Sequence, residues 1–288
     1  MISVQVPATS ANCCIGFDCM GMALDWYATF TFEESLKLEI SGCPKEYQTW
    51  DNLVVQAFCR FCDIFHFPYP SFHLHIDSKI PFSRGLGSSA TCILGGLCGA
   101  NAWFGNFASK EEILKIATEM EGHPDNVAPA LLGNTILCHV DSENIEMIQL
   151  DCADWYGLAM IPEYSVSTKE ARSILPVSIS HKEASQQVSN ALFFVDALKT
   201  GNEKNLLRAG IDYLHEPYRK KLIPDYDRIS SFCSKEEIPM WISGSGSTML
   251  AVSMKKEKIN NLKQFIQIYG INCIDVKIAK KGVQIKYE

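Results

Sequence analysis

The chain has 288 residues, 47% of them hydrophobic and 20% charged, which is typical of a globular protein with two domains or one large shared core. Its formal net charge of −7 argues against a nucleic-acid partner, because such surfaces normally carry a basic excess. The N-terminus lacks a basic leader, and the most apolar stretch, residues 90–104, is short for a membrane span. We therefore expect a cytoplasmic protein with no membrane partner and with its 12 cysteines as free thiols.

The N-terminal part of the chain predicts a β-hairpin with a polar loop. Residues 2–6 and 20–32 have strand patterns, and the turn formers at residues 7–12 are expected to break the first strand. The loop between the strands contains Asn12 and Asp18. A polar loop between two strands is a common place for a binding site, and a plain hairpin is the alternative.

A helix and a strand come next. Residues 53–65 have helical periodicity, with Asp51 as the expected N-terminal cap. Residues 72–76 alternate as a strand, with His73 and His75 on one face. Two histidines on one strand face point outward more often than they bind a metal, so we predict no metal site there.

The strand leads into a glycine loop at residues 80–91, in which Gly85 and Gly87 allow consecutive N–H groups to turn toward one point. Such a concavity binds anions. Ser88 and Ser89 are expected to cap a following helix, whose N-terminus adds to the attraction for a phosphate. Serine hydroxyls also suit Mg²⁺. The alternative is a simple loop before a helix.

The middle of the chain predicts one capped helix, a turn and two strands. Ser109 begins a capping box, and the helix that follows is expected to end near residues 119–122. The two prolines in residues 123–130 predict a turn. Residues 135–140 and 155–161 have strand patterns, and the polar interval 141–154 is the expected change of domain.

The last third of the chain combines helices and strands. Thr168 and Arg172 share one face if their segment is helical, and Ser180 begins a second capping box. Arg219 lies in a basic cluster and by itself indicates a surface charge. The remaining expected elements are helices at 188–198, 203–215 and 259–268, a strand–glycine turn–strand unit at 241–252, and a last strand at 272–279.

Three motifs together carry a resemblance to a known family. The loop Pro81-x-x-x-Gly-Leu-Gly-Ser-Ser-Ala90 lacks the lysine of a Walker loop and the third glycine of a dinucleotide loop, and it resembles the phosphate loop of the GHMP small-molecule kinases. Residues 243–248 resemble their third motif, with Ser247 in place of a proline. Residues 7–18 and 123–129 resemble the homoserine kinase branch, although Cys13-Cys-Ile15 replaces the usual Leu-Gly-Pro.

The resemblance implies an α+β GHMP kinase fold in two domains. Residues 1–150 would form an N-terminal, nucleotide-binding, ribosomal-protein-S5-domain-2-like β/α domain. Residues 151–288 would form a ferredoxin-like α/β C-terminal domain. The implied cofactors are ATP and Mg²⁺, and the implied partner is the small-molecule substrate L-homoserine. The sequence leaves the choice between a monomer and a homodimer open.

The resemblance also implies a set of site residues. Those expected to bind the nucleotide are Asn52, Pro81, Phe82, Ser83, Arg84, Gly85, Leu86, Gly87, Ser88, Ser89, Ala90 and Thr91. Those expected to bind the substrate are Asn12, Asp18, His123, Thr168, Arg172 and Arg219. Mg²⁺ would be held by Ser89 or Ser88 together with Glu119 or Glu121, and the catalytic residues would be Asp125, Asn126 and Arg172.

The implied reaction is Mg²⁺-assisted, in-line transfer of a phosphoryl group from ATP to the side-chain hydroxyl of L-homoserine, in threonine biosynthesis. Whether a general base exists stays open, because the first strand is not followed by the lysine that some family members pair with an aspartate. One alternative is a GHMP kinase for another small alcohol. The other is a ligand sensor without activity on the same fold.

Overall fold

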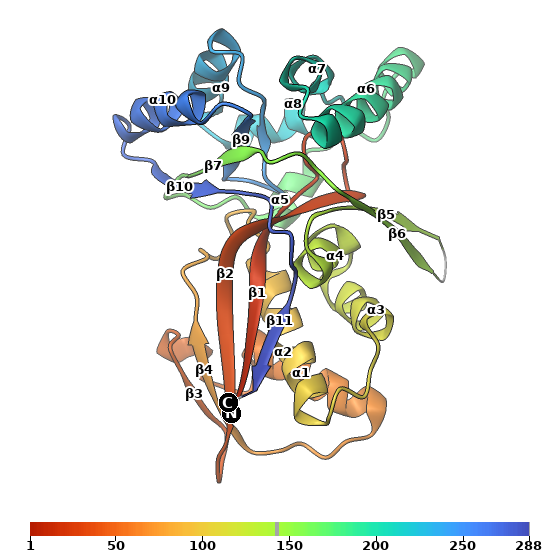
Figure 1. Ribbon diagram of the computed structural model, residues 1–288, viewed down its shortest axis with the longest axis vertical. Coiled ribbons are helices and arrows are strands. Elements are labelled where there is room, and N and C mark those ends of the chain that lie inside the picture. The colour runs from red at the N-terminus through yellow and green to blue at the C-terminus, as the bar shows by residue number, and fades with distance from the viewer. Residues whose placement is uncertain (142–143, 288) are drawn as a thin grey trace.

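The computed structural model describes residues 1–141 and 144–287, in which the strands form two separate sheets (Figure 1). The first sheet has the strand order β11-β1-β2-β4-β3, and β5 and β6 extend it through β2. Its strands are β1 (Ile2–Ala11), β2 (Met20–Glu34), β3 (Glu39–Ser41), β4 (Phe72–Asp77), β5 (Thr135–Val140), β6 (Ile145–Leu150) and β11 (Gln284–Tyr287).

Strand β1 corrects one expectation, because residues 7–11 continue the strand and do not break it. It pairs antiparallel with β2 from Ile2 to Ala11, with a register shift between Pro7 and Ala8. A proline is tolerated in a strand at such a bulge, since the local ladder is already interrupted. The expected hairpin between these strands is confirmed.

Helices α1 (Leu53–Phe65), α2 (Ser88–Trp103), α3 (Lys110–Glu121) and α4 (Pro124–Leu132) lie beside this sheet (Figure 1). The capping box at Ser109 is confirmed, whereas α1 is capped by Asn52 and not by Asp51, with the Asn52 side chain accepting a hydrogen bond from Val54 N. The turn expected at 123–130 is wrong. This segment is helical, and Pro124 is compatible with the helix because it stands at the first position, where a missing N–H costs nothing.

The second sheet has the order β10-β7-β9-β8 and is antiparallel throughout. The helix expected at 203–215 is shorter than predicted and ends at Ala209, because Asp212 and its neighbours form a separate capping loop before α8. The elements of this half are β7 (Tyr156–Ile161), β8 (Met240–Ile242), β9 (Met249–Ser253), β10 (Asn272–Val276), α5 (Thr168–Ser173), α6 (His181–Thr200), α7 (Glu203–Ala209), α8 (Glu216–Arg219), α9 (Tyr226–Lys235) and α10 (Lys256–Gln267), with short 3₁₀ turns at Lys45–Tyr47 and Lys220–Leu222.

The end of the chain returns to the first sheet. After β10, β11 pairs antiparallel with β1, so the two termini lie next to each other (Figure 1). Residues 142–143 of the expected domain change and residue 288 fall outside the described residues. All 12 cysteines are described and are free thiols. Within the described ranges, no helix has the length and apolar character needed to cross a membrane.

Candidate active site

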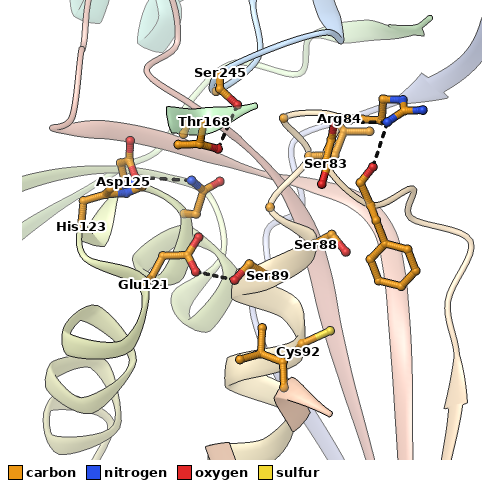
Figure 2. Close-up of a pocket in the computed structure, with 18 of the residues that line it drawn as sticks. Ser83, Arg84, Ser88, Ser89, Cys92, Glu121, His123, Asp125, Thr168 and Ser245 are labelled. Carbon is orange, nitrogen blue, oxygen red and sulfur yellow. Dashed lines mark hydrogen bonds and ion pairs between the residues drawn. The ribbon is translucent and has the colours of Figure 1, made fainter. Parts of the chain in front are cut away.

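A cavity of about 590 Å³ lies where the two halves of the chain meet. One side is formed by the glycine loop, the start of α2 and the start of α4. The other side is formed by α5, α8 and the turn between β8 and β9, and Figure 2 labels Thr168 of α5 and Ser245 of this turn. Both expected sets, for the nucleotide and for the substrate, therefore contribute to one cavity.

The start of α2 has the geometry of a phosphate site. Gly87 is the N-terminal cap with φ 66°, and a β-carbon there would lie 1.9 Å from Thr9 Oγ1, so only glycine fits. Ser88 and Ser89 are the first two helical residues and do not cap the helix with their side chains, which corrects the expectation. Their N–H groups have no acceptor within the helix, and the helix dipole adds positive charge at this end. The free N–H groups and the positive end of the helix dipole therefore suit a phosphate group.

Ser89 and Glu121 place a hydroxyl group and a carboxyl group beside this helix start. Ser89 Oγ donates a hydrogen bond of 2.7 Å to Glu121 Oε2 (Figure 2). Burial raises the pKa of the Glu121 carboxyl group, although the hydrogen bond from Ser89 opposes this shift. Glu119 lies outside the cavity and forms an ion pair of 3.5 Å with Arg60. A hydroxyl and a carboxylate are a donor set that suits Mg²⁺, so Ser89 and Glu121 fit the ion.

The glycine loop is attached to the second half of the chain by its own polar groups. Arg84 donates from Nε to Pro162 O at 3.2 Å, and it also donates to Glu163 O, Phe82 O and Ser83 O. Ser243 Oγ donates to Gly85 O at 2.6 Å. The guanidinium of Arg84 therefore joins the glycine loop to the segment that follows β7. The sequence predicted only a nucleotide-binding role for this residue.

At the start of α4, four side chains form a short hydrogen-bonded chain, in which Asn126 Nδ2 donates to Asp125 Oδ1 at 3.4 Å. His123 Nδ1 donates to Asp125 Oδ1 at 2.5 Å, and Thr9 Oγ1 donates to Asn126 Oδ1 at 2.6 Å. The hydrogen bond to Asp125 raises the pKa of the His123 imidazole, although burial opposes the shift. Gly21 on β2 allows this helix to approach closely, because a β-carbon there would lie 1.6 Å from Asp125 O. The result is a buried carboxyl group at the cavity wall.

The opposite wall carries two arginines. Arg172 on α5 makes a two-pronged ion pair with Asp18, with N···O distances of 3.0 and 2.9 Å. Arg219 on α8 is buried and donates to Gly244 O at 3.0 Å and Ala171 O at 3.2 Å. Burial lowers its pKa to about 10, so it keeps its charge at neutral pH. Asn12 Nδ2 donates to the same Gly244 carbonyl at 2.9 Å. Two guanidinium groups suit a carboxylate ligand.

Most of the expected site residues line this cavity. Of the nucleotide set, the structure brings together Asn52 and residues 82–89, but not Pro81, Ala90 or Thr91. The side chain of Asn52 is already engaged, since its oxygen caps α1 and its nitrogen donates to Tyr47 O. The remaining lining residues from the expected sets are Asn12, Asp18, Glu121, His123, Asp125, Asn126, Thr168, Arg172 and Arg219.

Sequence reasoning missed several residues of the cavity wall. Gly244 and Ser245 line it, and Ser245 Oγ lies 3.4 Å from Thr168 Oγ1 (Figure 2). Both residues could have been predicted from the sequence, because they belong to the glycine turn at 243–248. Cys43 and Tyr47 also line the cavity. They stand in an interval with no periodic pattern, so no sequence signal could have identified them.

Comparison with known proteins gives a consistent family. A model of the GHMP kinases N terminal domain matches residues 52–134. A homoserine kinase from Clostridium beijerinckii is 38% identical over 293 residues, which cover 99% of this chain and 98% of the relative. A homoserine kinase from Crocosphaera subtropica is 40% identical over 273 residues, covering 91% of this chain and 88% of the relative.

Solved structures give the same fold. The homoserine kinase from Cytophaga hutchinsonii superposes with a TM-score of 0.86 at 27% identity, covering 99% of this chain and 97% of that one. The mevalonate kinase from Methanococcus jannaschii, at 16% identity, has a TM-score of 0.72 and covers 96% of this chain and 98% of that chain. The expected α+β GHMP kinase fold is therefore confirmed.

Proposed function

The chain belongs to the homoserine kinases of the GHMP kinase family, and from that premise we propose which of its residues carry the reaction. The reaction transfers the γ-phosphoryl group of ATP to the side-chain hydroxyl of L-homoserine, giving O-phospho-L-homoserine and ADP in threonine biosynthesis. The observation that carries the assignment is the single cavity in which a phosphate-binding helix start faces two arginines.

The residues of the glycine loop and of α2 hold the phosphates of ATP. Gly87, Ser88 and Ser89 line the end of the cavity where the first N–H groups of α2 and the helix dipole favour negative charge. Ser89 and Glu121 hold Mg²⁺, which supplies charge neutralisation for the β- and γ-phosphates when it is bound. Glu119 takes no part, because it lies on the surface with Arg60.

The opposite wall orients the amino-acid substrate. Arg172 and Arg219 bind its carboxylate, and Asp18 attracts its ammonium group while keeping Arg172 in place through the ion pair. Asn12, His123 and Thr168 bind the remaining polar groups. Phosphoryl transfer depends mainly on alignment and on neutralisation of charge, so this orientation supplies much of the catalysis.

Asp125 and Asn126 lie at the start of α4, on the wall that also carries the glycine loop, and we place the meeting of the substrate hydroxyl and the γ-phosphate beside them. The Asp125 carboxyl group already accepts a hydrogen bond from His123, and Asn126 is held by Thr9. We predict that Asp125→Ala slows turnover without abolishing it, because little proton transfer is needed early in a loose transition state. The measurement is kcat with circular dichroism as the control for folding. Complete loss of activity with an intact fold would instead identify a true general base.

The proposed function is tested by ADP release from the purified protein with ATP and Mg²⁺. We expect release with L-homoserine that exceeds release with mevalonate, shikimate or sugars by orders of magnitude. Preference for one of the other alcohols would assign a different GHMP kinase activity. Binding of homoserine without ADP release would indicate a sensor, which the retained Ser89–Glu121 pair argues against.

A further inference from the structure

The loop that carries Asn12 and Asp18 is held in a strained conformation. Asn12, Cys13, Cys14 and Asp18 all have positive φ, at 67°, 40°, 67° and 57°. A left-handed conformation is unfavourable for most non-glycine residues and persists only where the surroundings enforce it. The loop therefore needs external contacts to present its two polar side chains to the cavity.

Two buried side chains supply these contacts through the loop carbonyls. Gln187 on α6 donates from Nε2 to Ile15 O at 3.0 Å, and His215 Nε2 lies 2.6 Å from Cys14 O. Because a carbonyl oxygen can only accept, Nε2 of His215 carries the proton. His215 is completely buried, and its other ring nitrogen, Nδ1, has no hydrogen-bond partner among the described residues.

The ring of His215 also supports a second part of the loop. It stacks on Phe17, with ring centroids 5.3 Å apart and 26° between the ring planes. The guanidinium carbons of Arg219 and Arg172 lie 5.0 and 5.8 Å from the centre of the same Phe17 ring. Phe17 thus connects the buried histidine with both arginines that face the substrate.

His215 is itself fixed by a carboxylate. Asp212 accepts hydrogen bonds from the backbone N–H of His215 at 2.6 Å and of Glu216 at 2.8 Å, and from Gln187 Nε2 at 2.9 Å. It therefore caps the short helix that also carries Arg219, and it connects that helix to α6. The Cys14 carbonyl, the Phe17 ring and the helix that carries Arg219 are therefore all held by the buried residues His215 and Asp212.

We propose that His215 is a positioning residue that sets the affinity for the amino-acid substrate, by holding Cys14 O and the Phe17 ring beneath Arg172 and Arg219. This inference rests on the proposed function. We expect loss of His215 to leave the glycine loop and α2 unchanged, because its hydrogen bonds and its ring contact are made with the loop after β1, with Asp212 and with α8. The effect is therefore selective for the amino acid over ATP.

The test compares His215→Leu, His215→Gln and the matched control Trp155→Phe. Trp155 is also buried and donates from Nε1 to a backbone carbonyl, Leu198 O, at 2.8 Å, but it does not line the cavity. We expect His215→Leu to raise KM for homoserine about tenfold, equal to about 1.4 kcal/mol, with KM for ATP within about twofold. His215→Gln keeps an N–H donor and is expected to lie between wild type and His215→Leu.

Trp155→Phe is expected to lower the unfolding temperature without changing either KM. Equal KM values for homoserine in wild type and His215→Leu would overturn the inference while leaving the proposed function intact. If His215→Leu does not fold, the variant Phe17→Leu tests the same inference. It is expected to raise KM for homoserine selectively, and an unchanged value would overturn the inference. A wild-type protein that releases no ADP with homoserine would overturn the proposed function and, with it, this inference.

Discussion

Glu216 carries a buried carboxyl group that is protonated at neutral pH. Burial raises its pKa to about 8, and Asp212 contributes to the rise while Arg219 opposes it. Its Oε1 accepts a hydrogen bond of 2.6 Å from Ile242 N, and Cys14 Sγ lies 3.8 Å from Oε2. A neutral acid can stay in this position without a cationic partner, which leaves the charge of Arg219 available to the cavity.

Because of this raised pKa, protonation of Glu216 makes the free energy of unfolding depend on pH. The folded state holds the Glu216 proton up to about pH 8, whereas an unfolded chain releases it near its ordinary value of 4.5. The contribution to stability is thus complete below about pH 4.5 and is lost as the pH rises toward 8. We expect the difference in free energy of unfolding, wild type minus Glu216→Gln, to fall by up to about 1.4 kcal/mol per pH unit. Urea titrations between pH 5 and 8 measure it, and parallel curves would contradict the assignment.

Cys14 lies in the strained loop after β1, and its φ of 67° is one that glycine adopts freely. Alanine normally stabilises a chain relative to glycine, but here its β-carbon keeps the strain. We expect Cys14→Gly to be more stable than Cys14→Ala by about 0.5–1 kcal/mol. Chemical unfolding of the two variants measures this difference. The reverse order would show that the loop relaxes once the thiol is removed.

At the scale of elements, the end of α3 meets the start of α2. The C-terminal turn of α3 contains both glutamates that the sequence offered for Mg²⁺, and only Glu121 faces Ser89. We expect Glu121→Gln to raise the Mg²⁺ concentration for half-maximal activity about tenfold, because a charged ligand becomes neutral. Glu119→Gln is the matched control and should leave that concentration unchanged. Titration of ADP release with Mg²⁺ measures both, and equal effects would assign the ion elsewhere.

Local patterns predicted most of the elements because their signals lie within the elements themselves. The capping boxes at Ser109 and Ser180 are made by hydrogen bonds that span three residues, and both are present. The errors arose where distant contacts outweighed local preference. Residues 7–11 stay in a strand because β2 pairs with them, and α4 forms despite Pro129 because it packs closely against Gly21.

At the scale of the whole molecule, the C-terminal strand completes the first sheet. Residues 2–5 of β1 pair with β11 on one side and with β2 on the other. A chain that ends after Val283 leaves the backbone groups on one side of β1 exposed. We expect its unfolding temperature to fall by about 5 °C, which corresponds to a loss of one to two kcal/mol for a chain of this size.

Tyr287→Phe is the control for this truncation, because it removes only the two hydrogen bonds between the Tyr287 hydroxyl and the Asn106 side chain. We expect almost no change in its unfolding temperature. An equal fall in both proteins would assign the effect to the side chain and not to the strand. The division of the chain at residue 150 stays a prediction, and a fragment of residues 1–150 would lack β11.

The sequence by itself determined the family, the reaction and the phosphate loop, because each depends on a short motif in which the neighbours along the chain set the backbone. Only the tertiary structure placed Glu121 and not Glu119 beside Ser89, buried Arg219, and paired Asp18 with Arg172 across 154 residues of chain. The contacts that join Asp212, His215 and Phe17 could likewise not be predicted from the sequence. Such contacts depend on how two sheets pack against each other, and that packing is a property of the whole chain and not of any segment.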